Sequence, residues 1–388
     1  MKKKFITLCT VIFLLFQLAA CKDSSVKIVV ASDIHYLASE LYDDGDAFMS
    51  LLRNDDGKAT MYVEEIVDKF IDEMLKLKPK MVVFSGDISF EGERLSHEEL
   101  ADKLSKLTDK GIKVAVMPGN HDLNNNSASG YSGDESYKVE SVSVSEFKEI
   151  YGAFGYGDAL YTDEDSMSYI AEVNENTWVV LVDVNGNSDP LHISASTIEW
   201  LRDKLDYAKR HDITVFSFTH QNIVDHSLNS ERYKLYDDND ELYYALTENG
   251  VKANFSGHSH FQHYEQLYGL KEIVTSSLST YPCKYGVIEI KSNGIEYNTR
   301  ELNVKHIEEI KQFFYDTVLN KEGNKLSDEE LRAYYLNILE NYYFGSLDKI
   351  EVNEEYLEEI GSMNGSLYLE AKYISDQAGR DSNHVVIE

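Results

Sequence analysis

Aspartate, histidine and asparagine residues are grouped into five short motifs between residues 33 and 260. In chain order the motifs are Asp33-Ile34-His35, Gly86-Asp87, Gly119-Asn120-His121-Asp122, His220 and Gly257-His258-Ser259-His260. Carboxylate oxygens, an amide oxygen and imidazole nitrogens, without a thiolate, suit borderline or hard divalent ions such as Mn, Fe, Zn, Ni or Co. The residue types therefore predict a metal site and leave the identity of the metal open.

No single motif is strong evidence for such a site. An isolated Asp-x-His pair occurs by chance, and one histidine after a strand is more often a hydrogen-bonded surface or core residue. However, five of the twelve histidines belong to these motifs, and each motif follows a hydrophobic run that is typical of a strand. We therefore interpret the five motifs together as one metal site.

Six hydrophobic runs rich in β-branched residues are predicted to form the strands that position the motifs. They cover residues 27–31, 80–84, 113–117, 178–182, 214–218 and 253–255. Five of the six runs end directly before a motif, and open α/β sheets place their active sites at the carboxyl ends of strands. We therefore expect the motifs to meet at one edge of the sheet system.

The spacing within the motifs indicates how the ligands are presented. Because alternate residues of a strand point to the same side, Asp33 and His35 are expected to bind the same ion. His258 and His260 repeat this i, i+2 arrangement. A glycine before Asp87 permits a sharp turn of the backbone, which would place this carboxylate where its two oxygens can bridge two cations.

Helical patterns between the strands predict a layered α/β domain. Residues 62–77 carry an apolar stripe on one face. Ser96 with Glu99, and Ser196 with Glu199, have capping-box spacing and predict the start of two further helices.

The later segments of the domain have a different sequence pattern. The runs 272–276, 285–291 and 295–300 lack intervening helices and are predicted to be antiparallel strands, so the sheets should be mixed. Residues 122–142, rich in Asn, Ser and Gly, are predicted to form the longest loop. The acidic segment 40–46 is expected to be either a rim over the site or a solvated loop.

The chain divides into regions of different character. Residues 26–303 are predicted to form the main α/β domain. Beyond them the pattern changes to long helices over 304–319 and 327–344, rich in Tyr, Phe, Glu and Leu. Residues 304–388 are therefore predicted to be a helical C-terminal appendage.

The N-terminus has the pattern of an export signal. Lys2, Lys3 and Lys4 precede an uncharged apolar run that is too short to favour a membrane span, so residues 1–20 are predicted to be a signal peptide. The end of this run resembles the bacterial lipobox, which predicts lipidation of Cys21 and a tether over 21–25. The protein would then be exported and held at the membrane, outside the cytoplasm, by its N-terminal lipid. An ordinary signal peptide and an N-terminal anchor helix are the alternatives.

Charge and cysteine content limit the partners. The formal net charge is −31, and it becomes −34 without the three lysines of the predicted signal. Such a field repels nucleic acid polymers, but a small phosphoester stays compatible with it because bound metal ions invert the local charge. Removal of the signal leaves Cys21 and Cys283, so no disulfide framework is predicted.

With these motifs, the chain resembles the calcineurin-like metallophosphoesterase superfamily. The ordered blocks of that superfamily are D-x-H, G-D, G-N-H-D/E, H and G-H-x-H, and all five are present between residues 26 and 303. The chain looks most like bacterial secreted members, with the class III cyclic-nucleotide phosphodiesterases as relatives. The fold that this resemblance implies is a four-layer α/β/β/α sandwich of two mixed sheets.

The resemblance also implies roles for the motif residues. Two divalent metal ions are expected, one held by Asp33, His35 and His260, the other by Asn120, His220 and His258, with Asp87 bridging them. His121 matches the catalytic histidine of the family. Asp122 is expected either to orient His121 or, equally, to cap its own loop.

We therefore expect a dinuclear-metal hydrolase of a small phosphodiester. Hydroxide held between the two ions would attack the phosphorus, and His121 would act as the catalytic acid or stabilise the phosphoryl charge. A phosphomonoesterase or nucleotidase is one alternative, and a non-catalytic surface-binding lipoprotein that keeps the fold is another. A protein phosphatase is disfavoured because this chain carries an export signal.

Overall fold

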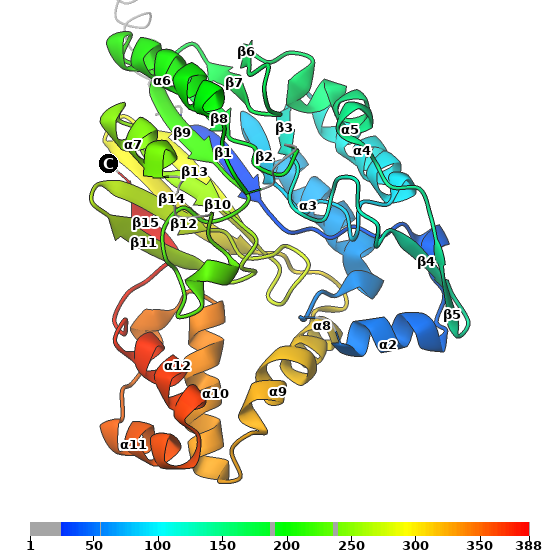
Figure 1. The fold of residues 1–388 in the computed structure, drawn as a ribbon, viewed down its shortest axis with the longest axis vertical. Coiled ribbons are helices and arrows are strands. Elements are labelled where there is room, and N and C mark those ends of the chain that lie inside the picture. The colour runs from blue at the N-terminus through cyan, green and yellow to red at the C-terminus, as the bar shows by residue number, and fades with distance from the viewer. Residues whose placement is uncertain (1–24, 55, 187–190, 236–239, 388) are drawn as a thin grey trace, which may run out of the picture.

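The computed structural model describes residues 25–387 except 55, 187–190 and 236–239 (Figure 1). The predicted signal peptide and Cys21 lie outside these described residues. Within the described part of the chain, no helix is both long enough and apolar enough to cross a membrane.

A six-stranded mixed sheet carries the first three motifs. Its order is β15-β14-β13-β1-β2-β3, and its strands are β1 (Val26–Ala31), β2 (Met81–Ser85), β3 (Lys113–Met117), β13 (Lys284–Lys291), β14 (Gly294–Glu301) and β15 (His384–Val386). Strands β1, β2 and β3 run parallel, whereas β13 pairs antiparallel with β1 and with β14. The carboxyl ends of β1, β2 and β3 therefore lie at the same edge.

A seven-stranded mixed sheet carries the other two motifs. Its order is β11-β12-β10-β9-β8-β7-β6, and its strands are β6 (Tyr161–Thr162), β7 (Tyr169–Asn174), β8 (Thr177–Leu181), β9 (Thr214–Phe218), β10 (Asn254–Ser256), β11 (His263–Leu267) and β12 (Leu270–Val274). Strands β8, β9, β10 and β12 are parallel neighbours. The run 272–276 is predicted to be an antiparallel strand. Strand β12 pairs antiparallel with β11 but parallel with β10, so this prediction is only half right.

The two sheets pack face to face, with helices outside. Ile28 and Val30 of β1 point into an apolar core shared with Phe216 and Phe255 of the other sheet. The alternate residue Val29 points outward to helices α3 (Val63–Leu77), α4 (Arg94–Thr108) and α5 (Val144–Ile150). Helices α6 (Ala195–Arg210) and α7 (Asp240–Glu248) cover the seven-stranded sheet (Figure 1). The predicted four-layer α/β/β/α sandwich of two mixed sheets is confirmed.

The predicted helix starts at Ser96 and Ser196 are wrong, because both residues lie inside helices. Helix α4 begins after Glu93, and the buried Ser96 hydroxyl instead accepts a hydrogen bond from the backbone N–H of Ala38, at 3.1 Å. Helix α6 is capped by Ser194, whose hydroxyl accepts from the N–H of Thr197. Tertiary contacts and a neighbouring serine therefore outweigh the capping-box spacing at these two positions.

Two segments that were predicted to be loops contain regular structure. The predicted long loop 122–142 holds the hairpin β4 (Ser129–Ser132) and β5 (Glu135–Lys138), and the acidic segment leads into helix α2 (Asp46–Asn54). The N–H of Ala47 donates to the carbonyl of Gly133, at 3.0 Å. Helix α2 and the hairpin β4–β5 are thus joined into one unit (Figure 1).

The C-terminal region is largely helical, as predicted, but it ends in a sheet. Its helices are α8 (Ile307–Phe314), a π-helical turn (Tyr315–Leu319), α9 (Asn320–Gly323), α10 (Glu329–Tyr343), α11 (Glu354–Met363) and α12 (Gly365–Ser375). Tyr342 donates a hydrogen bond to the carbonyl of His226 in the main domain, at 2.8 Å. The chain then returns as β15, which pairs antiparallel with β14 and was not predicted.

The burial of β15 predicts that the end of the chain stabilises the whole domain. Val385 is buried in the core between the sheets, whereas its neighbour Val386 is exposed. Val385→Ala should lower the free energy of unfolding by about 1–3 kcal/mol, because it removes two buried methyl groups and leaves a cavity. The matched Val386→Ala should change that free energy by less than about 0.5 kcal/mol. Equal effects of the two variants in urea unfolding would contradict this placement.

Candidate metal centre

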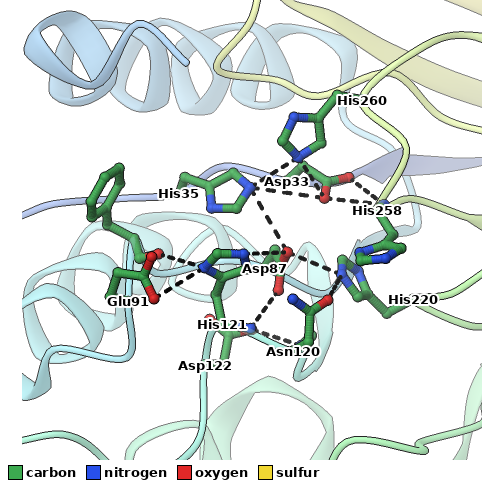
Figure 2. Close-up of polar contacts among 12 residues, drawn as sticks. Asp33, His35, Asp87, Glu91, Asn120, His121, Asp122, His220, His258 and His260 are labelled. Atoms are coloured by element: carbon green, nitrogen blue, oxygen red, sulfur yellow. Dashed lines mark hydrogen bonds and ion pairs between the residues drawn. The ribbon is translucent and has the colours of Figure 1, made fainter. Parts of the chain in front are cut away.

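The five motifs lie together at the carboxyl ends of the strands that precede them. Figure 2 shows the side chains of the loops after β1, β2, β3, β9 and β10 converging on a common centre. Three of these loops belong to one sheet and two belong to the other. The packing of the two sheets is therefore what brings residues 33 and 260 into contact.

The candidate ligands form two groups, within each of which the ligand atoms lie no more than 4.8 Å apart. One group is Asp33, His35 and His260, and the other is Asp87, His220 and His258. In the first group, Nε2 of His35 lies 3.1 Å from Nε2 of His260, which lies 3.4 Å from Oδ1 of Asp33. In the second group, Nε2 of His220 lies 3.1 Å from Oδ2 of Asp87.

Asp87 lies between the two groups. Its Oδ2 atom is 3.1 Å from Nε2 of His220 and 3.8 Å from Nε2 of His35. Its side chain is buried, and burial acts to raise its pKa. The positive charges of His220 and His121 outweigh burial and hold that pKa well below its usual range. An ionised carboxylate thus faces both groups.

Asn120 completes the second group. Its Oδ1 atom is 3.1 Å from Nε2 of His220. The side-chain amide of Gln221 donates to the same oxygen, at 3.4 Å, and to Oδ1 of Asn185, at 2.8 Å. These contacts fix the orientation of the Asn120 amide with its oxygen toward the centre.

The donor chemistry of both groups fits divalent cations. Two imidazole nitrogens 3.1 Å apart can share only one proton, and carboxylate oxygens face them from within the same group. Several nitrogen and oxygen atoms that can act as ligands therefore converge within each group. A divalent ion with nitrogen and oxygen ligands satisfies such a set, so the residues present fit two metal ions.

The backbone of the ligand residues is unusual. Asp33, His35, Asp87, His258 and His260 all have positive φ, between 47° and 65°. This left-handed conformation is uncommon for residues with a side chain and is often found at functional sites. Because β1 already ends at Ala31, alternation along a strand is the wrong explanation for the pairing of Asp33 with His35. Each side chain is instead directed by its own left-handed turn.

All three motif glycines are required by close approach, and at Gly119 a Cβ atom would lie 2.1 Å from Oδ1 of Asp87. Gly86 has φ +101°, and a Cβ atom there would lie 2.5 Å from Nδ1 of His220. At Gly257 a Cβ atom would lie 1.9 Å from Oγ of Ser32 and 2.5 Å from a carboxylate oxygen of Asp33. Any side chain at these positions would displace residues of the two ligand groups.

Asp122 makes the contacts of a loop cap. Its buried carboxylate accepts hydrogen bonds from the N–H groups of Gly119, at 2.7 Å, and Ser89, at 2.8 Å. It also accepts from the N–H of Ile88 and from the hydroxyl of Ser89, at 3.2 and 2.6 Å. Asp122 therefore ties the loop after β3 to the loop after β2, which corresponds to the second of its two predicted roles.

His121 is oriented by residues that the motifs did not include. Its Nδ1 atom lies 3.1 Å from the carbonyl oxygen of Phe90. The same atom lies 3.3 Å from Oε2 of Glu91 (Figure 2). Burial acts to lower the pKa of His121, but the charge of Asp87 and the hydrogen bond with Glu91 raise it to about 10. Glu91 lies four residues after Asp87, beyond the end of the motif, so only its acidic character could have suggested it.

Two further residues beside the first group were also missed. Oδ2 of Asp56 lies 3.4 Å from Nδ1 of His260, and its Oδ1 lies 3.1 Å from Nζ of Lys58. Both residues follow helix α2, which was not predicted. Without that helix, nothing in the sequence placed them near residue 260.

Sequence comparison is consistent with the motifs. A family model described as calcineurin-like phosphoesterase matches residues 26–262. No curated protein sequence matches the chain.

Comparison with solved structures finds a related fold. A dimetal phosphatase from Danio rerio is 13% identical, with 71% of this chain and 96% of that chain covered and a TM-score of 0.51. Purple acid phosphatase PPD1 from yellow lupin (Lupinus luteus) seeds is 11% identical, with 73% of this chain and 53% of that chain covered and a TM-score of 0.49. The first of these likenesses shows a shared fold.

Proposed function

Because the chain belongs to the calcineurin-like phosphoesterase family, a family of metal-dependent phosphoester hydrolases, we propose that its substrate is a small phosphodiester. The observation that carries this proposal is the convergence of two ligand groups beside His121. A phosphodiester carries one negative charge, whereas a phosphomonoester carries nearly two at neutral pH. The net charge of −31 therefore repels a monoester more strongly than a diester during its approach, before it reaches the bound metal ions that would invert the local charge.

The two ligand groups assign the residues that would hold the metal ions. Asp33, His35 and His260 would hold one ion, and Asn120, His220 and His258 the other, with Asp87 between them. Two divalent ions bound in this way polarise the phosphoryl oxygens and lower the pKa of water, which supplies the nucleophile.

His121 is placed to act as the acid of the reaction. The carbonyl of Phe90 accepts a hydrogen bond from Nδ1, so that nitrogen keeps its proton. The opposite atom, Nε2, lies 3.9 Å from Oδ2 of Asp87 and therefore faces the centre. We assign to Nε2 the transfer of a proton to the leaving oxygen. Glu91 acts through His121 as a positioning residue.

We also propose that the protein is exported and held at the membrane by a lipid on Cys21. This proposal rests on residues 1–25 alone, whose charged start, apolar run and terminal Leu18-Ala19-Ala20-Cys21 have the order of a lipoprotein signal. A short tether would leave the folded domain close to the membrane surface.

Hydrolysis of synthetic esters tests the proposed function. The chain, stripped of metal and then loaded with Mn, should hydrolyse bis-p-nitrophenyl phosphate faster than p-nitrophenyl phosphate. His121→Ala should lower turnover by about 10²–10⁴-fold while metal content is unchanged. The loss should be larger for diphenyl phosphate than for bis-p-nitrophenyl phosphate, because phenolate is the poorer leaving group and needs the proton more.

The exposed His211 provides a matched control, and His211→Ala should leave turnover unchanged. If two ions bind but no ester is hydrolysed with any of the metals, the chain is a non-catalytic binding protein. Faster hydrolysis of the monoester would favour a phosphomonoesterase.

Substitution of Glu91 tests how His121 is held. Glu91 raises the pKa of His121, and the reaction needs the protonated imidazole, so activity is lost as the pH rises through that pKa. Glu91→Gln should therefore move the alkaline limb of the kcat/KM profile to lower pH. Glu98, an exposed residue of α4, provides a matched Glu98→Gln control. Identical alkaline limbs for both variants would refute the positioning role.

A further inference from the structure

The edge of the two sheets opposite the metal centre is formed by the amino ends of the parallel strands. Strands β1, β2 and β3 begin there on one sheet, and β9, β10 and β12 begin there on the other. Two contacts between the sheets confirm that both sets of amino ends lie on the same side. Nζ of Lys113 lies 2.5 Å from the carbonyl oxygen of Glu172, and Nζ of Lys271 lies 2.7 Å from that of Ile387.

Lysines line this edge on the six-stranded sheet. The backbone N–H of Lys80 donates to the carbonyl of Lys27, at 2.8 Å, and the N–H of Lys113 donates to that of Lys80, at 3.2 Å. Three lysines are therefore neighbours across β1, β2 and β3. The segments of this sheet that reach the edge carry seven lysines and one aspartate, and they are residues 25–27, 76–80, 107–113 and 291–294. We call these four segments the lysine edge.

This concentration of positive charge is unusual in so acidic a chain, which has 68 acidic and 37 basic residues. On the seven-stranded sheet, the segments at the same side are nearly balanced, with four basic and three acidic residues over 174–177, 209–214, 247–254 and 266–271. The lysine edge is therefore a positive region on a molecule whose remaining surface is strongly negative.

Several cations of the lysine edge face the solvent. Lys78, Lys80 and Lys110 are exposed, and none of them forms an ion pair with another described residue. The lysines of β1 and β13 are different, because they share the carboxylate of Glu289. The charge that an external anion can reach therefore comes mainly from the segments after α3 and α4.

An exposed aromatic residue lies on the same side of the molecule. The turn between β11 and β12 carries Tyr268, which is 90% exposed, next to Leu267, which is 40% exposed. Tyr243 of α7 donates a hydrogen bond to the carbonyl of Tyr268, at 3.0 Å, and so fixes the turn. Tyrosine is enriched at membrane–water interfaces, because its ring is apolar while its hydroxyl group stays hydrated.

The chain also enters the fold at this edge. Strand β1 begins at Val26, five residues after Cys21, and an extended chain spans at most about 3.6 Å per residue. A lipid on Cys21 would therefore hold the lysine edge within about 18 Å of the membrane surface. The metal centre lies beyond the other end of the six-residue strand β1, about 20 Å farther out.

We propose that the lysine edge and the β11–β12 turn dock on a membrane with anionic head groups and turn the metal centre toward the solution. This inference rests on the lipid at Cys21, which is part of the proposed function. The same membrane repels the acidic remainder of the protein, so attraction and repulsion favour one orientation. The substrate is then a small ester dissolved in water, because phospholipids of the anchoring bilayer lie out of reach of the metal centre.

Fluorescence quenching of the full lipidated chain in vesicles tests this orientation. A fluorophore is attached through Tyr268→Cys or, as the matched control, through Tyr137→Cys on the hairpin β4–β5, at the side of the metal centre. Cys283 is buried and does not compete for the label. In vesicles of phosphatidylglycerol and phosphatidylcholine, a nitroxide on the head groups should quench the label at position 268 and leave the label at position 137 bright.

Removal of lysines tests the electrostatic part. Lys78→Gln, Lys80→Gln and Lys110→Gln together should lower the ratio of docked to undocked chains by about 100-fold, since each lysine near an anionic surface contributes a factor of about 5. Quenching at position 268 should then fall toward its value in vesicles of phosphatidylcholine alone.

Three exposed lysines away from the edge provide the control for this change in net charge. Lys305 follows β14 at the side of the metal centre, and Lys321 and Lys349 belong to the C-terminal region. Their combined replacement by Gln should leave the quenching at position 268 unchanged.

The outcomes separate this inference from the anchor on which it rests. If the chain floats with the vesicles but the two labels are quenched equally, or if phosphatidylglycerol has no effect at position 268, the anchor stands and the inference is overturned. It is also overturned if the label at position 268 is shielded from a water-soluble quencher but not reached by the lipid nitroxide, since a protein then covers this edge. If the chain does not float with the vesicles, the anchor fails together with the inference.

Discussion

The buried carboxylate of Asp87 is the constraint on which the rest of the site depends. It is 1% exposed, ionised, and faces His35, His121 and His220. A buried negative charge is stable only if positive charge surrounds it. Three separate loops must therefore place cations, or side chains that bind cations, around this carboxylate. The two packed sheets do this, because their parallel strands end at a common edge, and the left-handed turns after those strands direct each side chain inward.

Much of this arrangement could be predicted because its signals are local. The strands at residues 113–117 and 214–218 have the predicted bounds, since short β-branched runs before a turn are typical of buried strands. Other features depend on distant partners. Strand β15 has three residues and is defined by its pairing with β14, about ninety positions earlier. Glu91 and Lys58 reach the site only through the packing of loops, so no motif marks them.

Residues outside the motifs form a depression on one side of the metal centre. On the side of His121, the loop with Glu91, helix α2 and the hairpin β4–β5 form an open depression of about 610 Å³, which Lys58 also lines. The protein as a whole is strongly acidic, with a formal net charge of −31, and three carboxylates, of Asp46, Glu91 and Asp134, line this depression.

The most direct test of the central claim is crystallography of the Mn-loaded chain with anomalous diffraction. The account predicts two anomalous peaks about 3.5–4 Å apart. One should lie against Asp33, His35 and His260, the other against Asn120, His220 and His258, with Asp87 in contact with both. A single peak, or two peaks away from Asp87, would contradict the dinuclear centre.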